Sequence, residues 1–171
     1  MSNPPQHPDL RTELLDRAER DRQARSALSN PPTPQEWARV RAVDAENTPW
    51  LRAIIDEHGW PGSTLVGTDG AHAAWLLAQH APPELRRHWL PLLHEAVQAD
   101  HASPVDLAYL DDRVRTDQQL PQRHGTQWRV DGPETRLLPL DDPPQVNTRR
   151  RALGLPEIPD NDLTNALPPC D

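Results

Sequence analysis

Proline placement limits how long the helices of this chain can be. The 171 residues include 21 prolines, more than twice the roughly 5% of average proteins. Proline has no backbone N–H, so it is tolerated in the first turn of a helix and disfavoured further in. Many of the prolines lie near the two ends of the chain or directly before amphipathic stretches. They predict a series of short helices that each begin close to a proline.

The spacing of apolar residues predicts the first three of these helices. Residues 9–29 place Leu10, Leu14 and Ala18 on one face, with dense charges between them. Thr33-Pro34-Gln35-Glu36 has the spacing of a capping box and predicts a second helix that ends near Glu46. Asn47-Thr48-Pro49 has a similar arrangement and predicts a third helix that ends at Gly59.

The rest of the chain predicts shorter helices and one hairpin. The expected helices are 68–80, 83–99 with a kink or division at Pro91, 103–116, and 144–153. Two stretches, 125–130 and 135–140, flank Asp131-Gly132, which is typical of a β-hairpin. We therefore expect a mainly α fold: a helical bundle-like single domain over residues 9–155 with a small β-hairpin near the C-terminus.

Composition predicts that the ends are not part of this domain. Hydrophobic residues make up 35% of the chain and its mean hydropathy is -0.82, which is low for a compact domain. We expect residues 1–8 to be a disordered lead and residues 156–171, rich in Pro and Asn, to be a flexible tail. Phe is absent, so Trp supplies most of the aromatic groups. Trp60 and Trp128, in loop or hairpin contexts, are candidate pocket residues.

Charge and residue usage exclude several classes of function. Lysine is absent, which removes Schiff-base chemistry and the P-loop phosphate lysine. The formal net charge of -8 disfavours nucleic acid and anionic membranes as partners. No apolar run approaches the roughly 20 residues of a membrane span. The N-terminal residues do not resemble a signal peptide, and Cys170 is a single cysteine, so we expect a cytoplasmic protein.

Polar residues form three clusters that could carry chemistry. The familiar patterns G-x-S-x-G, G-x-G-x-x-G, H-E-x-x-H and C-x-x-C are absent from the sequence. No spacing resembles a zinc ligand set either, so we expect no metal and no other cofactor. The clusters are Asp69 with His72, Gln79 and His80; Asp111-Asp112-Arg113; and residues 122–127.

The favoured hypothesis pairs His80 with Asp112 as a general acid–base dyad, because a histidine with a carboxylate partner can transfer protons near neutral pH. Arg113 would hold a substrate carboxylate or phosphate. His124 would be a second proton carrier, and Asn47 and Gln127 would bind substrate polar groups. The structural alternative is that Asp112 and Arg113 tie their helix to the 122–127 loop and that His80 caps its own helix.

The chain also resembles an uncharacterised bacterial domain family over about residues 40–158. The motifs occur in the order N-T-x-W-L, G-W-P, Q-H-A, D-R-V, Y-G-T-Q and R-R-x-x-G-L, and this chain has His124 where the family has Tyr. No activity is implied by the resemblance. It implies that these residues occupy the polar and aromatic motif positions: Asn47, Trp60, Gln79, His80, Asp112, Arg113 and Gln127.

Three functions remain open at this point. The first is a cofactor-free acid–base enzyme that hydrolyses, isomerises or cyclises a polar or anionic small molecule or peptide, with Asp69 and Gln79 among its binding residues. The second is a non-catalytic binding domain with a groove lined by Trp60 and Trp128, in which the charged helix 9–29 forms a homodimer. The third is a metal-dependent hydrolase.

Overall fold

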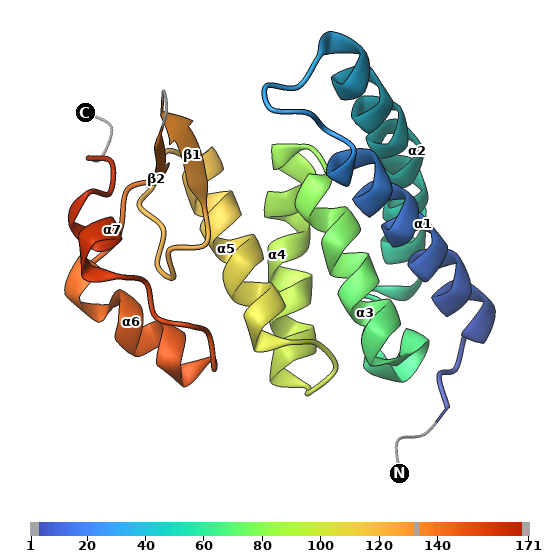
Figure 1. Ribbon diagram of the computed structural model, residues 1–171. Helices are drawn as coiled ribbons and strands as arrows, with labels where there is room; N and C mark the ends of the chain where they lie inside the picture. Colours follow the sequence, from blue (N-terminus) through green and yellow to red (C-terminus); the bar gives the residue numbers. More distant parts are fainter. Residues whose placement is uncertain (1–3, 132–133, 169–171) are drawn as a thin grey trace. The chain divides into compact units, whose positions relative to one another are not determined.

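The computed structural model describes residues 4–131 and 134–168, and the chain divides into two compact units (Figure 1). Unit 1 is Met1–Ser103 and unit 2 is Pro104–Asp171. The mainly α class with a small hairpin near the C-terminus is confirmed. Gly132 and Pro133 of the predicted hairpin and Cys170 lie outside the described residues, as do residues 1–3. Within the described ranges, no helix has both the length and the apolar character needed to cross a membrane.

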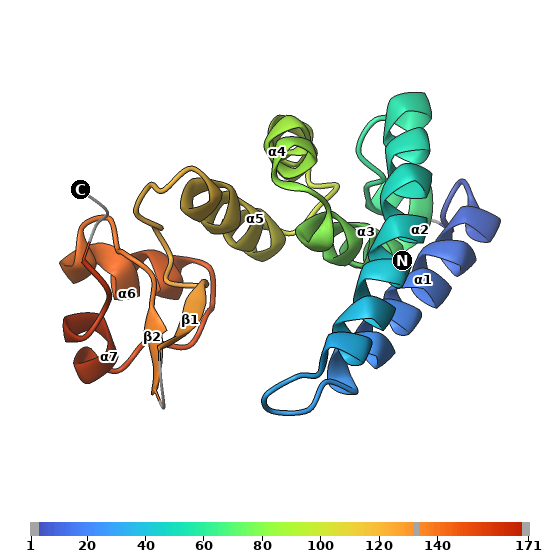
Figure 2. The ribbon, with the colours of Figure 1, turned by 90° about the horizontal axis from the view of Figure 1, so that it is seen from above.

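Unit 1 is built from four helices in its described part. They are α1 (Pro8–Ser26), α2 (Pro34–His58), α3 (Ser63–His80) and α4 (Pro83–Gln98). The first three pack against one another, and α4 packs against α3. Figures 1 and 2 both show α1 and α2 side by side. Leu14, Val40, Leu51 and Leu77 are buried side chains of these helices.

One helix replaces the two predicted between residues 33 and 59. The capping box is present, with Thr33 and Glu36 bonded to each other's backbone N–H, but α2 continues through Pro49 to His58. The buried residues Val40, Asn47 and Leu51 keep helical spacing across the proline. Packing against α1 and α3 therefore stays in phase, and it outweighs the hydrogen bond that Pro49 cannot make.

A glycine divides α3 where the sequence predicts a helix start. Gly67 has φ 75° and ψ 165°, outside the helical region, so the stretch after it begins at Thr68, as predicted. The short turn before Gly67 accepts backbone hydrogen bonds from Gln6 and His7 at Thr64 O and Leu65 O. This part of the predicted N-terminal lead is thus held against α3. In α4, the helix runs unbroken through Pro91.

Unit 2 combines helices with the hairpin. Its elements are α5 (Pro104–Asp117), β1 (Trp128–Asp131), β2 (Glu134–Leu137), α6 (Pro143–Ala152) and α7 (Asp160–Thr164). The strands are antiparallel and pair Trp128 with Leu137. Leu137 belongs to a buried aliphatic cluster with Leu140, Val146 and Ile158.

The C-terminal segment is part of the structure of unit 2 up to at least Leu167, in contrast to the loose tail expected from residue 156. The Asn147 side chain donates to Ile158 O at 2.9 Å and accepts from Ile158 N at 2.8 Å. Leu167 N donates to Leu137 O. A partly buried amide that satisfies both backbone groups of Ile158 holds a segment whose composition alone predicts disorder.

Candidate functional site

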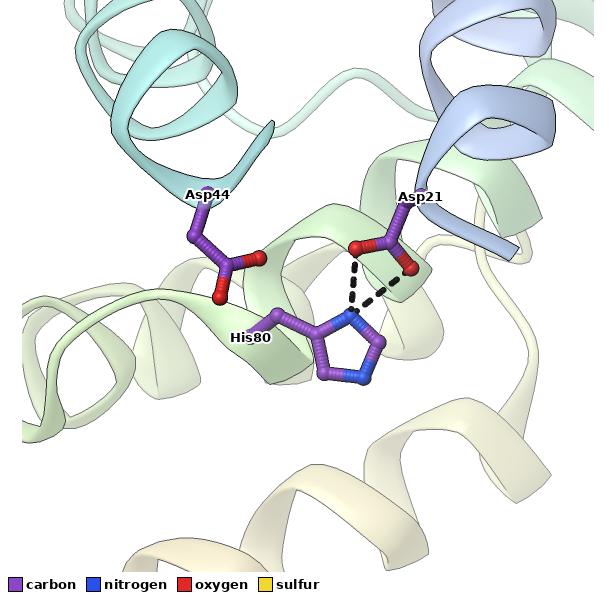
Figure 3. A group of neighbouring side chains, drawn as sticks. All are labelled: Asp21, Asp44 and His80. Atoms are coloured by element: carbon purple, nitrogen blue, oxygen red, sulfur yellow. Dashed lines mark hydrogen bonds and ion pairs between the residues drawn. The ribbon is translucent and has the colours of Figure 1, made fainter. Parts of the chain in front are cut away.

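His80 is the last residue of α3, and a buried carboxylate holds its ring. Asp21, on α1, is 2% exposed. Its Oδ2 and Oδ1 atoms lie 2.9 and 3.1 Å from His80 Nδ1. Figure 3 shows both carboxylate oxygens directed at Nδ1, while Nε2 points away from them.

Arg25 and Asp44 complete the group around His80. Arg25 lies one helical turn after Asp21 on α1, and Asp44 lies on α2. The Arg25 Nε atom is 3.1 Å from Asp21 Oδ1 and 3.0 Å from His80 Nδ1, and its Nη2 atom donates to Asp44 Oδ1. One guanidinium therefore contacts all three side chains and joins α1, α2 and α3.

The two carboxylates of this group differ in acidity. Burial raises the pKa of Asp21, but the hydrogen bonds and charges of His80 and Arg25 more than offset it, so its pKa lies below the ordinary value. For Asp44, burial outweighs the attraction of Arg25, and its pKa is raised. Asp21 is thus the more firmly ionised partner of the imidazole.

The hydrogen-bond geometry favours one tautomer of His80. An ionised Asp21 can only accept a hydrogen bond from His80 Nδ1, whereas the Arg25 Nε–H can only donate one to it. A proton on Nδ1 satisfies Asp21, and the Arg25 Nε–H can bond to Asp21 Oδ1 instead. Without that proton, the Nδ1 lone pair would face the carboxylate. The arrangement therefore leaves Nε2 as the acceptor nitrogen.

A surface pocket adjoins this group within unit 1. Its volume is about 540 Å³, and it is lined by His80, Asp44, Thr48, Arg86 and a mostly apolar remainder that includes Pro49 and Pro82. The Arg86 guanidinium donates to Gln79 O at 3.0 Å, which holds it beside the end of α3. The pocket thus combines an oriented imidazole with groups of both charges and an apolar wall.

The other predicted site residues of unit 1 are mostly buried. Asn47 is 5% exposed and accepts from Arg17 at 3.2 Å. Gln79 and Trp60 are 4% and 9% exposed, and their side-chain polar atoms have no hydrogen-bond partner among the residues that the structure describes. Asp69 is half exposed and pairs with Arg11, whose hydrogen bond lowers the pKa of Asp69. None of these four residues lines the pocket beside His80.

Asp112, in unit 2, organises the loop that follows α5. Its fully buried carboxylate accepts from the backbone N–H groups of Arg123, His124 and Thr126 and from the Thr126 hydroxyl. Burial raises the pKa of Asp112, but His124 and these donors lower it more, so its pKa lies below the ordinary value. These contacts match the structural alternative drawn from the sequence, in which Asp112 ties its helix to the loop.

Three further predicted residues lie on or near this loop. The His124 ring is mostly buried, with Nδ1 3.6 Å from Asp112 Oδ1. Gln127 is 7% exposed, and its backbone exchanges hydrogen bonds with the buried side chain of Gln122. Arg113 is half-buried on α5, and its carbonyl accepts from Thr116. Asp112, His124 and Gln127 are thus brought together in unit 2.

The comparisons with known proteins identify a family. Residues 8–164 match DUF6624, a family of unknown function. The chain belongs to this family. The match extends the resemblance seen over residues 40–158 to include α1, which carries Asp21 and Arg25. Comparison with curated proteins and with solved structures gives no match.

In this DUF6624 chain, His80 and Asp112 each have an acid–base partner within their own unit. His80 pairs with Asp21 in unit 1, and Asp112 pairs with His124 in unit 2. The pairing of His80 with Asp112 stays a prediction. The site predicted from the sequence lacks Asp21, Arg25 and Asp44, although Asp21 continues the buried stripe of Leu14 and Ala18 at helical spacing. A carboxylate on a buried stripe is the signal that could have identified it.

Each unit also holds three side chains with metal-ligand chemistry. Asp21, Asp44 and His80 offer ligand atoms within 4.8 Å of one another, and Asp111, Asp112 and His124 do the same. In the first group, Arg25 contacts all three residues, and its positive charge opposes a cation. In the second, loop donors surround the Asp112 oxygens. In both groups, hydrogen-bond donors of the protein already contact the carboxylate oxygens that would otherwise bind an ion.

Proposed function

We propose that the pocket of unit 1 binds a small polar molecule or peptide and that His80 acts there as a general acid–base catalyst. The observation that supports this is the contact of His80 Nδ1 with the buried Asp21 at the wall of a pocket. Asp21 here takes the orienting role that the sequence hypothesis gave to Asp112. A buried carboxylate that fixes the ring leaves Nε2 to exchange protons with a bound molecule.

The chemistry proposed needs only proton transfer. Nε2 takes a proton from a bound water or substrate group, and the imidazolium formed is stabilised by Asp21 and returns the proton to the departing or rearranging group. Hydrolysis, isomerisation and cyclisation all include such a step. Arg86 at the pocket wall suits a substrate with a carboxylate or phosphate group, which a guanidinium binds through two parallel hydrogen bonds.

Comparing matched histidine variants tests this proposal. The full chain is incubated with a panel of esters, amides, lactones and phosphate esters and with a metabolite extract, and turnover is followed by NMR. We expect His80→Gln to lower the rate by about 10²–10⁴, the usual contribution of general acid–base catalysis. His94→Gln is the control, because His94 is an exposed histidine on α4.

A second measurement examines the role of Asp21 without a known substrate. Long-range ¹H–¹⁵N spectra report which imidazole nitrogen carries the proton. We expect Nδ1–H for His80 in the wild type and a shift toward Nε2–H in Asp21→Asn, whose amide can donate to Nδ1. Unchanged turnover in His80→Gln would contradict acid–base catalysis by His80. A wild-type protein that binds ligands but does not turn them over would favour the non-catalytic binding domain.

A metal-dependent hydrolase is the second candidate, favoured by the closeness of the Asp21, Asp44 and His80 ligand atoms. Its test is elemental analysis of the purified protein, followed by titration with Zn²⁺. Binding of one equivalent in the wild type, lost in Asp44→Asn, would support it. The contacts of Arg25 make acid–base chemistry without a metal the first choice.

The cytoplasmic location and the homodimer also stay proposals. The dimer was expected through the charged helix 9–29, which corresponds to α1. Leu14 and Ala18 of α1 are buried, and α1 packs against α2 and α3. A dimer through α1 would therefore use its charged outer face.

A further inference from the structure

Unit 2 contains a second pocket, which does not depend on the acid–base proposal for unit 1. It is lined by residues of the hairpin and of α7, has a volume of about 300 Å³, and includes Trp128 among its lining residues. Figure 1 shows α7 beside β2, with which it is in contact. This volume is at the lower end of the range for small-molecule sites.

Trp128 is an exposed aromatic residue on a strand whose backbone is paired. Its backbone pairs with Leu137, and Leu137 is fully buried in the aliphatic cluster of unit 2. The Trp128 residue is nevertheless 42% exposed. Covering such an exposed aromatic side chain with a flat apolar face of a ligand is favourable, because it removes apolar surface from water.

The remainder of the pocket wall is polar and carries both charges. Its polar lining consists of Glu134, Thr135, Arg136, Asn161, Asp162 and Asn165. Asn165 and Asn161 lie one turn apart on one side of α7, with Asn165 Nδ2 donating to Asn161 Oδ1 at 3.1 Å. Arg136 Nε donates to Asn165 O at 2.9 Å, which ties β2 to the end of α7. These bonds fix amide and guanidinium groups in the wall of the pocket, to which Glu134 and Asp162 add carboxylates.

We propose that this pocket binds a neutral sugar ring. One face of a pyranose is made of C–H groups and matches the flat indole of Trp128, while its hydroxyl groups both donate and accept hydrogen bonds. Asp162 and Glu134 accept from such hydroxyls, Arg136 donates to them, and the asparagine amides do both. Apolar contact supplies affinity, and the polar groups select the arrangement of hydroxyls.

The charges of the lining disfavour other ligand classes. An anion such as phosphate would meet the carboxylates of Glu134 and Asp162. A quaternary ammonium ion would be attracted to the indole and the carboxylates, but Arg136 would oppose it. A neutral polyhydroxyl compound uses every type of group in the wall and requires no compensating charge.

The test is an NMR titration of the ¹⁵N-labelled full chain. The probes are methyl glucoside, methyl galactoside, N-acetylglucosamine, maltose and cellobiose, with choline, adenosine and inorganic phosphate as other classes. We expect at least one sugar to cause saturable shifts of the Trp128 indole N–H and of the Asn161 and Asn165 side-chain amides. Choline and phosphate should cause none, and adenosine should bind more weakly than that sugar.

Three variants assign the binding to this pocket. We expect Trp128→Ala to weaken sugar binding about tenfold or more, since it removes the surface on which the ring packs. Asp162→Asn keeps the shape of a side chain on α7 and is expected to weaken it by about threefold to tenfold, because the neutral amide oxygen still accepts a hydrogen bond but a weaker one than the carboxylate. Val130→Ala, on the same face of the hairpin, is the control, because Val130 is 75% exposed and outside the pocket.

Several results would overturn the proposal. These are the absence of saturable shifts with every sugar, tighter binding of choline or adenosine than of any sugar, and sugar affinity that is unchanged in both Trp128→Ala and Asp162→Asn. Backbone spectra that match the wild type outside the hairpin and α7 show that the variants are folded. Failure of the acid–base proposal for His80 would not affect the sugar-binding test, because the two pockets are lined by different residues.

Discussion

At the scale of single residues, the two buried aspartates have different roles. Asp21 contacts two side chains that can change charge or position, His80 and Arg25. Asp112 is surrounded mainly by backbone N–H groups of its loop. A carboxylate bonded to backbone donors maintains structure, whereas one bonded to an imidazole at a pocket can tune proton transfer.

Replacing Asp112 should therefore affect stability more than any activity. Asp112→Asn exchanges one accepting oxygen for an NH₂ group that faces backbone N–H donors, so buried donors lose their partner. We expect the free energy of unfolding at neutral pH to fall by about 2–4 kcal/mol, the cost of buried donors left unsatisfied beside a lost charged acceptor. Urea unfolding followed by circular dichroism measures it. A loss below about 0.5 kcal/mol, the level of an ordinary surface substitution, would contradict this role.

The same substitution should change the acid dependence of stability. The pKa of Asp112 is lowered in the folded state, so its contribution is present above the pKa of an unfolded aspartate, about 4. This contribution is lost as the pH falls through the lower folded pKa. The difference in unfolding free energy between the wild type and Asp112→Asn should thus shrink as the pH decreases below about 4. A difference that grows on acidification would show the opposite pKa shift.

At the scale of secondary structure, local signals located most helix starts and ends, and the exception is the junction at Pro49. The Thr33–Glu36 capping box and the start at Pro83 are where the sequence predicts them. The predicted break at Asn47-Thr48-Pro49 is absent, because the buried face of α2 continues across it. A capping residue and a proline allow a helix to begin, but they do not require the previous one to end.

Two threonine variants distinguish one long helix from two short ones. Thr33→Ala should cost about 1 kcal/mol of stability, because Thr33 caps α2. Thr48→Ala should be neutral or raise stability by a few tenths of a kcal/mol, because alanine is the better residue inside a helix. Thermal and urea unfolding measure both. A loss of about 1 kcal/mol in Thr48→Ala would instead indicate a second helix start at Pro49.

At the scale of the whole molecule, the chain separates into units with different cores. Unit 1 buries long helical faces that include Leu14, Leu51 and Trp89. The hairpin and α6 of unit 2 share a smaller aliphatic cluster around Leu137. The expectation of a single domain over residues 9–155 means that both units would unfold together. That expectation stays a prediction.

The size of these cores predicts a difference in local stability. Backbone amides of α3 should exchange with solvent more slowly than those of β1, β2 and α7, because opening α3 exposes more apolar surface. Hydrogen exchange followed by mass spectrometry measures this. Equal protection in both regions would show that the whole chain opens as one cooperative unit.

The amino-acid sequence by itself determined the mainly α class, most helix starts and the hairpin, because these depend on residues that are near one another along the chain. It also singled out His80 and Asp112 as residues of interest. Only the tertiary structure decided their partners. Asp21 is 59 positions from His80, and helix packing brings such distant residues together. Local spacing can show that a charged residue lies on a buried face, but the side chain that meets it there depends on how the helices pack.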